Sequence, residues 1–168
     1  GEGASSISQT FLVTAANSNF TIRYAVVLED PISGHSDSER PYFNVSMTDE
    51  LGNSMACADY RVIAKPPVTN FTTISGTDGN AYLYRNWTTV SIPLNAYIGQ
   101  NVTITFDVAD CALGAHRGYA YIDGSCLPFA IQTEYQAICT SAPVDLYGPD
   151  GYASYQWSGV GIISATNT

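Results

Sequence analysis

Alternation of apolar and polar side chains is the feature that most limits how this chain can fold. Within 101–108, Val102, Ile104, Phe106 and Val108 share one face, and Asn, Thr and Asp side chains occupy the other. Successive side chains of a strand point to opposite sides, so this period of two is typical of a half-buried strand. The same pattern recurs at 20–28 and 43–47, and no segment longer than one turn has the spacing of an amphipathic helix. An antiparallel β fold is therefore predicted.

Turn-forming residues divide the chain into short segments. Clusters such as Glu29-Asp30-Pro31, Asp49–Asn53 and Gly76–Asn80 fall between the apolar runs. The expected strands are 9–14, 20–29, 43–47, 55–64, 81–85, 87–92, 102–108 and 119–123, with a short helical turn at 93–99. The last two strands are expected to form a pair joined by the polar loop 110–118. This pattern predicts an all-β antiparallel β-sandwich.

The character of the sequence changes after Phe129. Residues 1–7 resemble a linker, and residues 8–129 contain the expected sandwich strands. In 130–168 further strands are expected at 131–140 and 152–157, but so short a stretch cannot form a sandwich alone. We interpret 130–168 as the start of a second immunoglobulin-like module. The alternative is that it adds strands to the first domain.

The charge balance excludes some partners and favours others. The chain carries 15 acidic and 6 basic side chains, a net charge of −9. So acidic a chain repels nucleic acid and anionic membrane surfaces. No apolar run approaches the length of about 20 residues that spans a bilayer, so membrane insertion is not expected. A cation, a divalent metal or a neutral glycan is a better match.

The four cysteines lie far apart in the sequence, without the close pairs of a zinc ribbon. Together with the abundance of Ser, Thr, Asn and Tyr, they favour an extracellular β protein with one or two disulfides. We favour a Cys57–Cys111 pairing, since Cys139 falls in the proposed second module. The alternative is four reduced thiols in a cytosolic protein.

The second half of the sequence resembles galactose-binding-like jelly rolls, which occur in carbohydrate-binding modules and in MAM-like domains. The resemblance lies in Trp87, in VSIPL at 90–94, in YIGQNV at 97–102, in Phe106 and in YAYID at 119–123. More narrowly, the chain resembles modules of very large cell-surface adhesins of gliding bacteria. That likeness lies in AVVLEDP with GH, PYFNV, DC with GAH, and GYAYIDGSC. The tail APVDLYGPDGYASYQWSG is similar to the start of the Ig- or PKD-like repeats that follow such modules.

This resemblance implies a jelly-roll fold, an extracellular position on the cell surface, gliding motility or surface attachment, and frequent glycan contact. The implied partners are an extracellular glycan or a solid surface, and neighbouring modules of the same long chain. Galactose-binding-like domains commonly hold a structural calcium ion. Asp123 matches the acidic residue of their last strand. The resemblance supplies no catalytic residue, and a fold alone does not fix a function.

Two acidic loops each contain one histidine, and we expect them to meet at one edge of the sandwich. The candidate metal ligands are Glu29, Asp30, His35, Asp107, Asp110, His116 and Asp123. Carboxylates and backbone carbonyls suit Ca²⁺, whereas participation of both imidazoles would favour Zn²⁺ or another transition ion. The alternative is that the acids are simply solvated and each histidine bonds to a nearby backbone group.

Tyrosines at two-residue spacing form the second candidate site. Tyr119 and Tyr121 share a strand face with Asp123, Tyr82 and Tyr84 repeat the spacing, and Arg117 adds a donor at the strand edge. Flat tyrosine rings on a rigid sheet suit sugar rings, because the apolar face stacks and the hydroxyls find polar partners. The alternative is that these tyrosines only fill the core and the edges of the sheets.

Enzymatic motifs are missing from the sequence. It has no Gly-x-Ser-x-Gly elbow, His-Glu-x-x-His helix or phosphate-binding glycine loop. We therefore predict a non-enzymatic adhesin module. The alternatives are a structural spacer in a repetitive surface filament and, more remotely, a domain that acts on polysaccharides.

Overall fold

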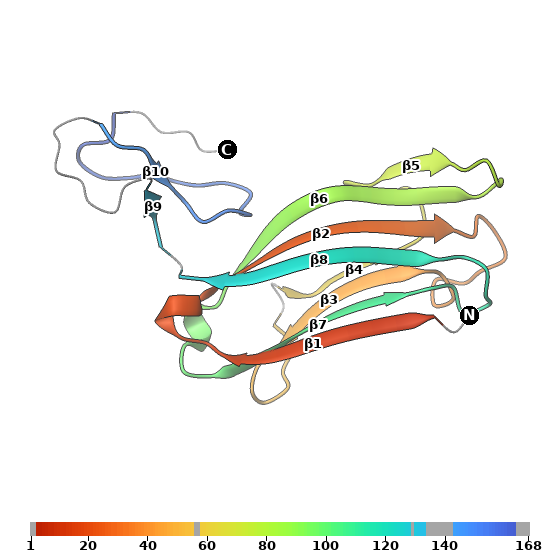
Figure 1. Ribbon diagram of the computed structural model, residues 1–168, viewed down its shortest axis with the longest axis horizontal. Helices are drawn as coiled ribbons and strands as arrows, with labels where there is room; N and C mark the ends of the chain where they lie inside the picture. The colour runs from red at the N-terminus through yellow and green to blue at the C-terminus, as the bar shows by residue number, and fades with distance from the viewer. Residues whose placement is uncertain (1–2, 56–57, 129, 134–142, 164–168) are drawn as a thin grey trace.

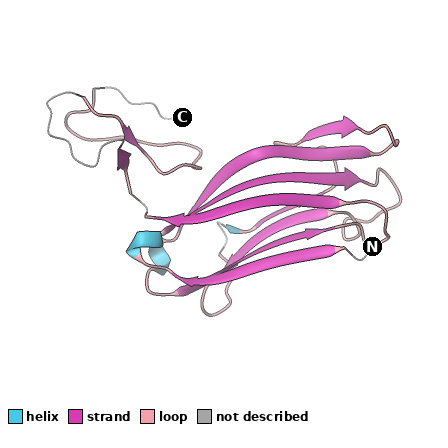
Figure 2. Ribbon diagram, viewed as in Figure 1, coloured by secondary structure: helices cyan, strands magenta, loops and turns pink. Residues whose placement is uncertain are grey.

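The computed structural model describes all residues except 1–2, 56–57, 129, 134–142 and 164–168. Two four-stranded antiparallel sheets lie face to face over this part of the chain (Figure 1), which confirms the predicted β-sandwich. Strands and loops make up nearly all of it, and its helical parts are short 3₁₀ turns (Figure 2). No helix among the described residues has the length and apolar character to cross a membrane.

Each sheet mixes strands from distant parts of the sequence. The first sheet has the order β1 (Ala4–Leu12), β7 (Asn101–Ala109), β3 (Tyr42–Thr48) and β4 (Tyr60–Ile63). The second has the order β5 (Thr72–Ser75), β6 (Ala81–Pro93), β2 (Asn19–Asp30) and β8 (Gly118–Leu127). The 3₁₀ turns are η1 (Ala15–Asn17) and η3 (Asn95–Tyr97), the latter within the predicted helical turn.

The core lies between the sheets and consists of the apolar faces that alternation predicts. Alternate residues of β2, from Phe20 to Leu28, are buried, as are those of β3 from Phe43 to Met47. In β7 the buried face runs from Val102 to Phe106. Burying one such side chain stabilises the fold by about 1.5–3 kcal/mol, so these rows together hold the two sheets against each other.

Several strand boundaries differ from the expected ones. β1 begins at Ala4, whereas the strand was expected to begin at residue 9. β4 begins at Tyr60, whereas a strand was expected from residue 55; of that stretch, residues 56–57 lie outside the described part. The two strands expected at 81–85 and 87–92 are one continuous strand, β6. A shift of register opposite Tyr24 and Val26 of β2 marks a β-bulge, which accounts for the break in alternation near Trp87.

The expected pairing of strands 102–108 and 119–123 is wrong. β7 lies between β1 and β3 in the first sheet, whereas β8 pairs with β2 in the second. Residues 110–117 therefore cross from one sheet to the other at the end of the sandwich. Sequence alternation identifies strands but does not say which sheet each strand joins.

The tail has its own two-stranded pairing of β9 (Gln132–Thr133) and β10 (Leu146–Tyr147). It contacts the sandwich through a turn, where the amide of Ser91 donates to the Gly151 carbonyl and the Tyr152 hydroxyl donates to Asn19 Oδ1 at 2.8 Å. Residues 152–157, expected as a strand, form a loop. Most of the strand expected at 131–140 lies outside the described residues, and a second module over 130–168 stays a prediction.

Tyr24 brings a hydroxyl group into the apolar core. Its side chain is 4% exposed, and its ring stacks on Phe43 with centroids 5.5 Å apart. Burial, reinforced by Tyr60, raises the pKa of the Tyr24 hydroxyl to about 12. The folded chain therefore keeps this hydroxyl neutral well above the ordinary tyrosine range.

This raised pKa predicts a loss of stability in alkali. Between about pH 10 and pH 12 the tyrosine of the unfolded chain ionises while folded Tyr24 keeps its proton, so the free energy of unfolding falls as the pH rises through this range. Tyr24→Phe removes the ionisable group, and denaturant unfolding at pH 9, 10 and 11 is expected to show a shallower fall. The same slope in wild type and variant would contradict the assignment.

Candidate functional site

One end of the sandwich gathers two imidazoles and a thiol. The β2–β3 loop carries His35, and the β7–β8 loop carries Cys111 and His116. One nitrogen of each ring and the Cys111 sulfur lie within 4.8 Å of one another. The two rings meet edge to face with centroids 5.0 Å apart. The expectation that these two loops share one rim is confirmed.

Backbone hydrogen bonds fix the β7–β8 loop. The Cys111 amide donates to the His116 carbonyl at 2.9 Å and closes the loop. Gly114 and Ala115 both take left-handed conformations (φ 84° and 80°), which reverse the direction of the chain between Cys111 and His116. The Ala112 amide donates to the Glu39 carbonyl at 2.8 Å, so the two loops are joined directly.

A buried ion pair anchors the β2–β3 loop. Arg40 Nη1 contacts Asp30 Oδ1 at 2.6 Å and also donates to the Ala64 carbonyl at 2.6 Å, and both charged side chains are about 10% exposed. Asp30 Oδ1 further accepts from the Ile32 amide. The pair ties the last residue of β2 to the start of β3 and thus sets where the intervening His35 lies.

Removing one partner of this pair leaves the other charge buried. We expect Arg40→Met to lower the free energy of unfolding by about 3 kcal/mol, measured by denaturant titration, because Asp30 loses its counter-ion. Lys65→Met is the matched control. It breaks the pair that Lys65, after β4, makes with Asp37 of the same loop. These side chains are 56% and 59% exposed, so the loss should be less than about 1 kcal/mol. Equal losses in the two variants would contradict an anchoring role for Arg40.

The carboxylates predicted as metal ligands do not join the histidines. Glu29 accepts from the Arg117 amide and from Asn80, and Asp110 accepts from the Gly118 amide. Asp30 is paired with Arg40. Among the described residues, the group close enough to hold an ion contains only His35 and His116 of the seven predicted ligands.

The other two predicted ligands lie on the strands. Asp107, on β7, accepts from Ser6 and Asn44 on the flanking strands of the first sheet. Asp123, on β8, is exposed and lies opposite Arg23 in the second sheet. Each of these acids thus lies on a sheet and not in the rim loops, and binding of Ca²⁺ stays a prediction.

Cys111 takes a different role from the predicted one. Cys57 lies outside the described residues, and Cys111 carries a free, fully buried thiol, so the predicted Cys57–Cys111 disulfide is not formed. Its sulfur donates to the Gly114 carbonyl at 3.1 Å and lies 3.2 Å from His35 Nε2. The signal that could have identified this role is the placement of Cys111 and His116 in one short loop.

The predicted ligand-binding aromatic residues all lie on the outer face of the second sheet. Val27 of β2 has Tyr84 of β6 as its partner on one side and Tyr119 of β8 on the other. One row away, Ala25 is the partner of Tyr121. Tyr119 and Tyr121 are 47% and 63% exposed, so their rings face solvent instead of the core. In the row on the other side of Val27, Glu29 of β2 has Tyr82 as its partner on β6, and its amide donates to the Arg117 carbonyl just before β8.

Trp87 belongs to the same face and was not among the predicted ligand residues. It sits in the β6 bulge opposite Ala25, is 54% exposed, and has the Arg23 guanidinium 5.7 Å from its ring centroid. The small Ala25 side chain thus separates two exposed aromatic residues, Trp87 and Tyr121. We call Trp87, Tyr84, Tyr119 and Tyr121 the aromatic face.

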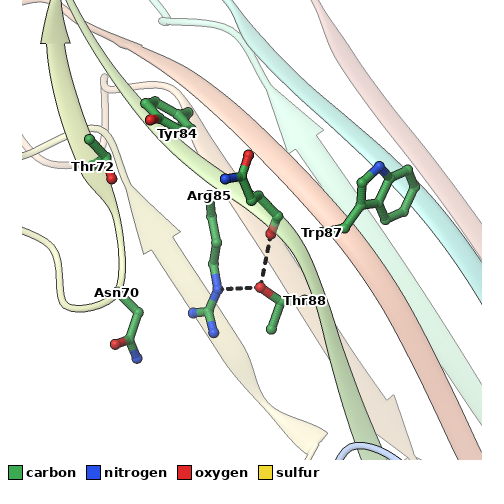
Figure 3. Close-up of a pocket in the computed structure, with 7 residues that line it drawn as sticks. Asn70, Thr72, Tyr84, Arg85, Trp87 and Thr88 are labelled. Atoms are coloured by element: carbon green, nitrogen blue, oxygen red, sulfur yellow. Dashed lines mark hydrogen bonds between the residues drawn. The ribbon is translucent and has the colours of Figure 1, made fainter.

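An open hollow borders the aromatic face along β5 and β6 (Figure 3). Its lining combines aromatic, amide and guanidinium groups, namely Asn70, Thr72, Tyr84, Arg85, Asn86, Trp87 and Thr88. Arg85 Nε donates to Thr88 Oγ1 at 2.9 Å, and that hydroxyl donates to the Asn86 carbonyl. Figure 3 shows Trp87 pointing to the opposite side of β6 from Arg85 and Thr88.

Two polar groups at the edge of this face keep fixed protonation states. A hydrogen bond to Asp78 raises the pKa of Tyr82 to about 12, so its hydroxyl stays neutral. Hydrogen bonding with Tyr119 raises the pKa of the Arg117 guanidinium further above its already high value. The face therefore offers hydroxyl and guanidinium donors beside aromatic rings across the physiological pH range.

Comparisons with known proteins give no family for this chain. No protein family model matches it, and no curated protein is significantly similar to it.

Proposed function

We propose that this chain is a non-enzymatic, extracellular module of a large cell-surface adhesin, and that the aromatic face contacts glycans on a cell or a solid surface. The observation that carries the proposal is the exposure of Trp87, Tyr119 and Tyr121, each about half or more exposed on one sheet. Leaving so many large rings in water gains nothing for the fold. A contiguous exposed apolar patch of this kind is typical of an interaction site.

The chemistry of the face matches a neutral sugar polymer. Sugar rings present flat patches of C–H groups that stack on aromatic rings, and their hydroxyls pair with donors and acceptors beside the rings. The sheet offers such groups beside the aromatic face in Arg23 on β2, Asp123 on β8 and Arg117 just before β8. The net charge of −9 favours an uncharged ligand over a polyanion.

A rigid support adds to the argument. The rings stand on β6 and β8, and both strands pair with β2 between them, which leaves the backbone little freedom. Tyrosine and tryptophan also lose few rotamers on binding. The shape is a flat face and a shallow hollow, which suits contact with a surface or an extended chain. It does not suit the enclosure of a small molecule.

Binding to glycans is expected to depend on the aromatic face. In a glycan array and in pull-down with insoluble polysaccharides, Trp87→Ala and Tyr121→Ala should each weaken binding by about threefold to tenfold, because each removes one stacked ring. Both side chains are exposed, so the melting temperature should change little.

The matched control is Tyr42→Ala. Tyr42 lies on the outward face of β3 in the opposite sheet, under the Arg61 guanidinium, and its loss should leave glycan binding unchanged. If wild type binds no glycan or surface, the module is a spacer between neighbours. If new reducing ends or unsaturated products form on incubation with polysaccharides, the non-enzymatic assignment is wrong.

A further inference from the structure

We infer that His35, Cys111 and His116 form a binding site for a transition metal ion of the Zn²⁺ class. Three donor atoms of the kinds that bind zinc already lie within 4.8 Å of one another. Zinc holds imidazole nitrogen at about 2.0–2.1 Å and thiolate sulfur at about 2.3 Å, so tetrahedral ligand atoms lie about 3.5 Å apart. The distance from His35 Nε2 to Cys111 Sγ, 3.2 Å, is close to that value.

The environment of each ring supports metal binding. His35 Nδ1 lies 3.0 Å from the Ser33 carbonyl, and a proton on Nδ1 would leave the lone pair of Nε2 directed at the Cys111 sulfur. A backbone carbonyl that fixes the tautomer in this way is the usual outer partner of a metal-bound histidine. His116 Nδ1 is buried and has no hydrogen-bond partner among the described residues. Burial without a partner is costly for such a group, and the ring therefore gains by binding a ligand.

The donor set selects the class of metal. Two nitrogens and a sulfur suit Zn²⁺, Co²⁺ and copper ions, whereas Ca²⁺ takes six to eight oxygens. Acids in and beside the two loops are engaged elsewhere, Asp30 with Arg40, Glu39 with the amide and hydroxyl of Ser36, and Asp110 with the Gly118 amide. Three protein ligands leave a fourth position for water, and both histidines are partly exposed to solvent.

The site needs little rearrangement to close on an ion. Cys111 and His116 are joined through the Cys111 amide and the His116 carbonyl, and the Ala112–Glu39 hydrogen bond brings the His35 loop against them. Cys111 follows a strand of the first sheet, whereas His35 follows and His116 precedes strands of the second. A bound ion would therefore cross-link the two sheets and stabilise the folded chain, whether or not the aromatic face binds a glycan.

Metal titration of the reduced, chelator-treated protein tests the site. Co²⁺ should give a near-ultraviolet thiolate-to-metal charge-transfer band at one equivalent, and Zn²⁺ should abolish the band by displacement. Zn²⁺ should also raise the melting temperature by several degrees. Ca²⁺ should do neither.

The variants identify the ligands. Cys111→Ser should remove the charge-transfer band. His35→Gln should weaken Co²⁺ binding at least tenfold, and the fold should tolerate it because this position is partly exposed. Cys126→Ser, at the second free thiol of the described residues, should keep the full band. The inference is overturned if Co²⁺ gives no thiolate band, if His35→Gln binds like wild type, or if the band follows Cys126.

Discussion

Burial of the alternating apolar faces of β2, β3 and β7 between two sheets is the interaction on which the rest of this structure depends. Each of these strands presents one continuous apolar row, and the rows from opposite sheets meet in a single core. Because successive side chains alternate, the same packing fixes which residues face outward. Fixing Val26 and Leu28 inward places Val27 outward, between Tyr84 and Tyr119.

Crossing between sheets, and not hairpin formation, creates the rim site. β7 and β8 are neighbours in sequence but belong to different sheets, so their connection has to span the end of the sandwich. The β2–β3 loop makes the same crossing from the second sheet to the first. Two crossings at one end, joined by the Ala112–Glu39 hydrogen bond, bring together side chains that are 76 residues apart in sequence, His35 and Cys111.

Sequence reasoning was successful where the physics is local. Alternation identified the inward faces of the long strands, because a period of two needs no knowledge of partners. The meeting of the two histidine loops was expected on the supposition that the strand ending at Glu29 lies beside the strands joined by 110–118, and of these β8 does pair with β2, whereas β7 does not. Sequence reasoning failed for the carboxylates, because their roles depend on which distant groups they pair with. The carboxylates near the histidines looked like ligands, but Arg40 takes Asp30, and backbone amides take Glu29 and Asp110.

The role of Cys111 shows the same limit. A cysteine spaced far from its neighbours is compatible with a disulfide or with a buried thiol, and only the crossing loop decides between them. Trp87 was not among the predicted ligand residues for a related reason, since a β-bulge interrupts the alternation that would have placed it beside Tyr121.

The path of the chain through the sandwich has a mechanical consequence. β1 enters beside the histidine loops, where Ala4 pairs with Ala109, and β8 leaves at the opposite end, where Leu127 pairs with Asn19 (Figure 1). Tension applied between these two points runs along the strands and loads the β1–β7 and β2–β8 ladders in shear. Every hydrogen bond of a ladder then shares the load at once, instead of breaking one after another as in an unzipping hairpin. A molecule that holds a cell to a surface against flow would benefit from this geometry.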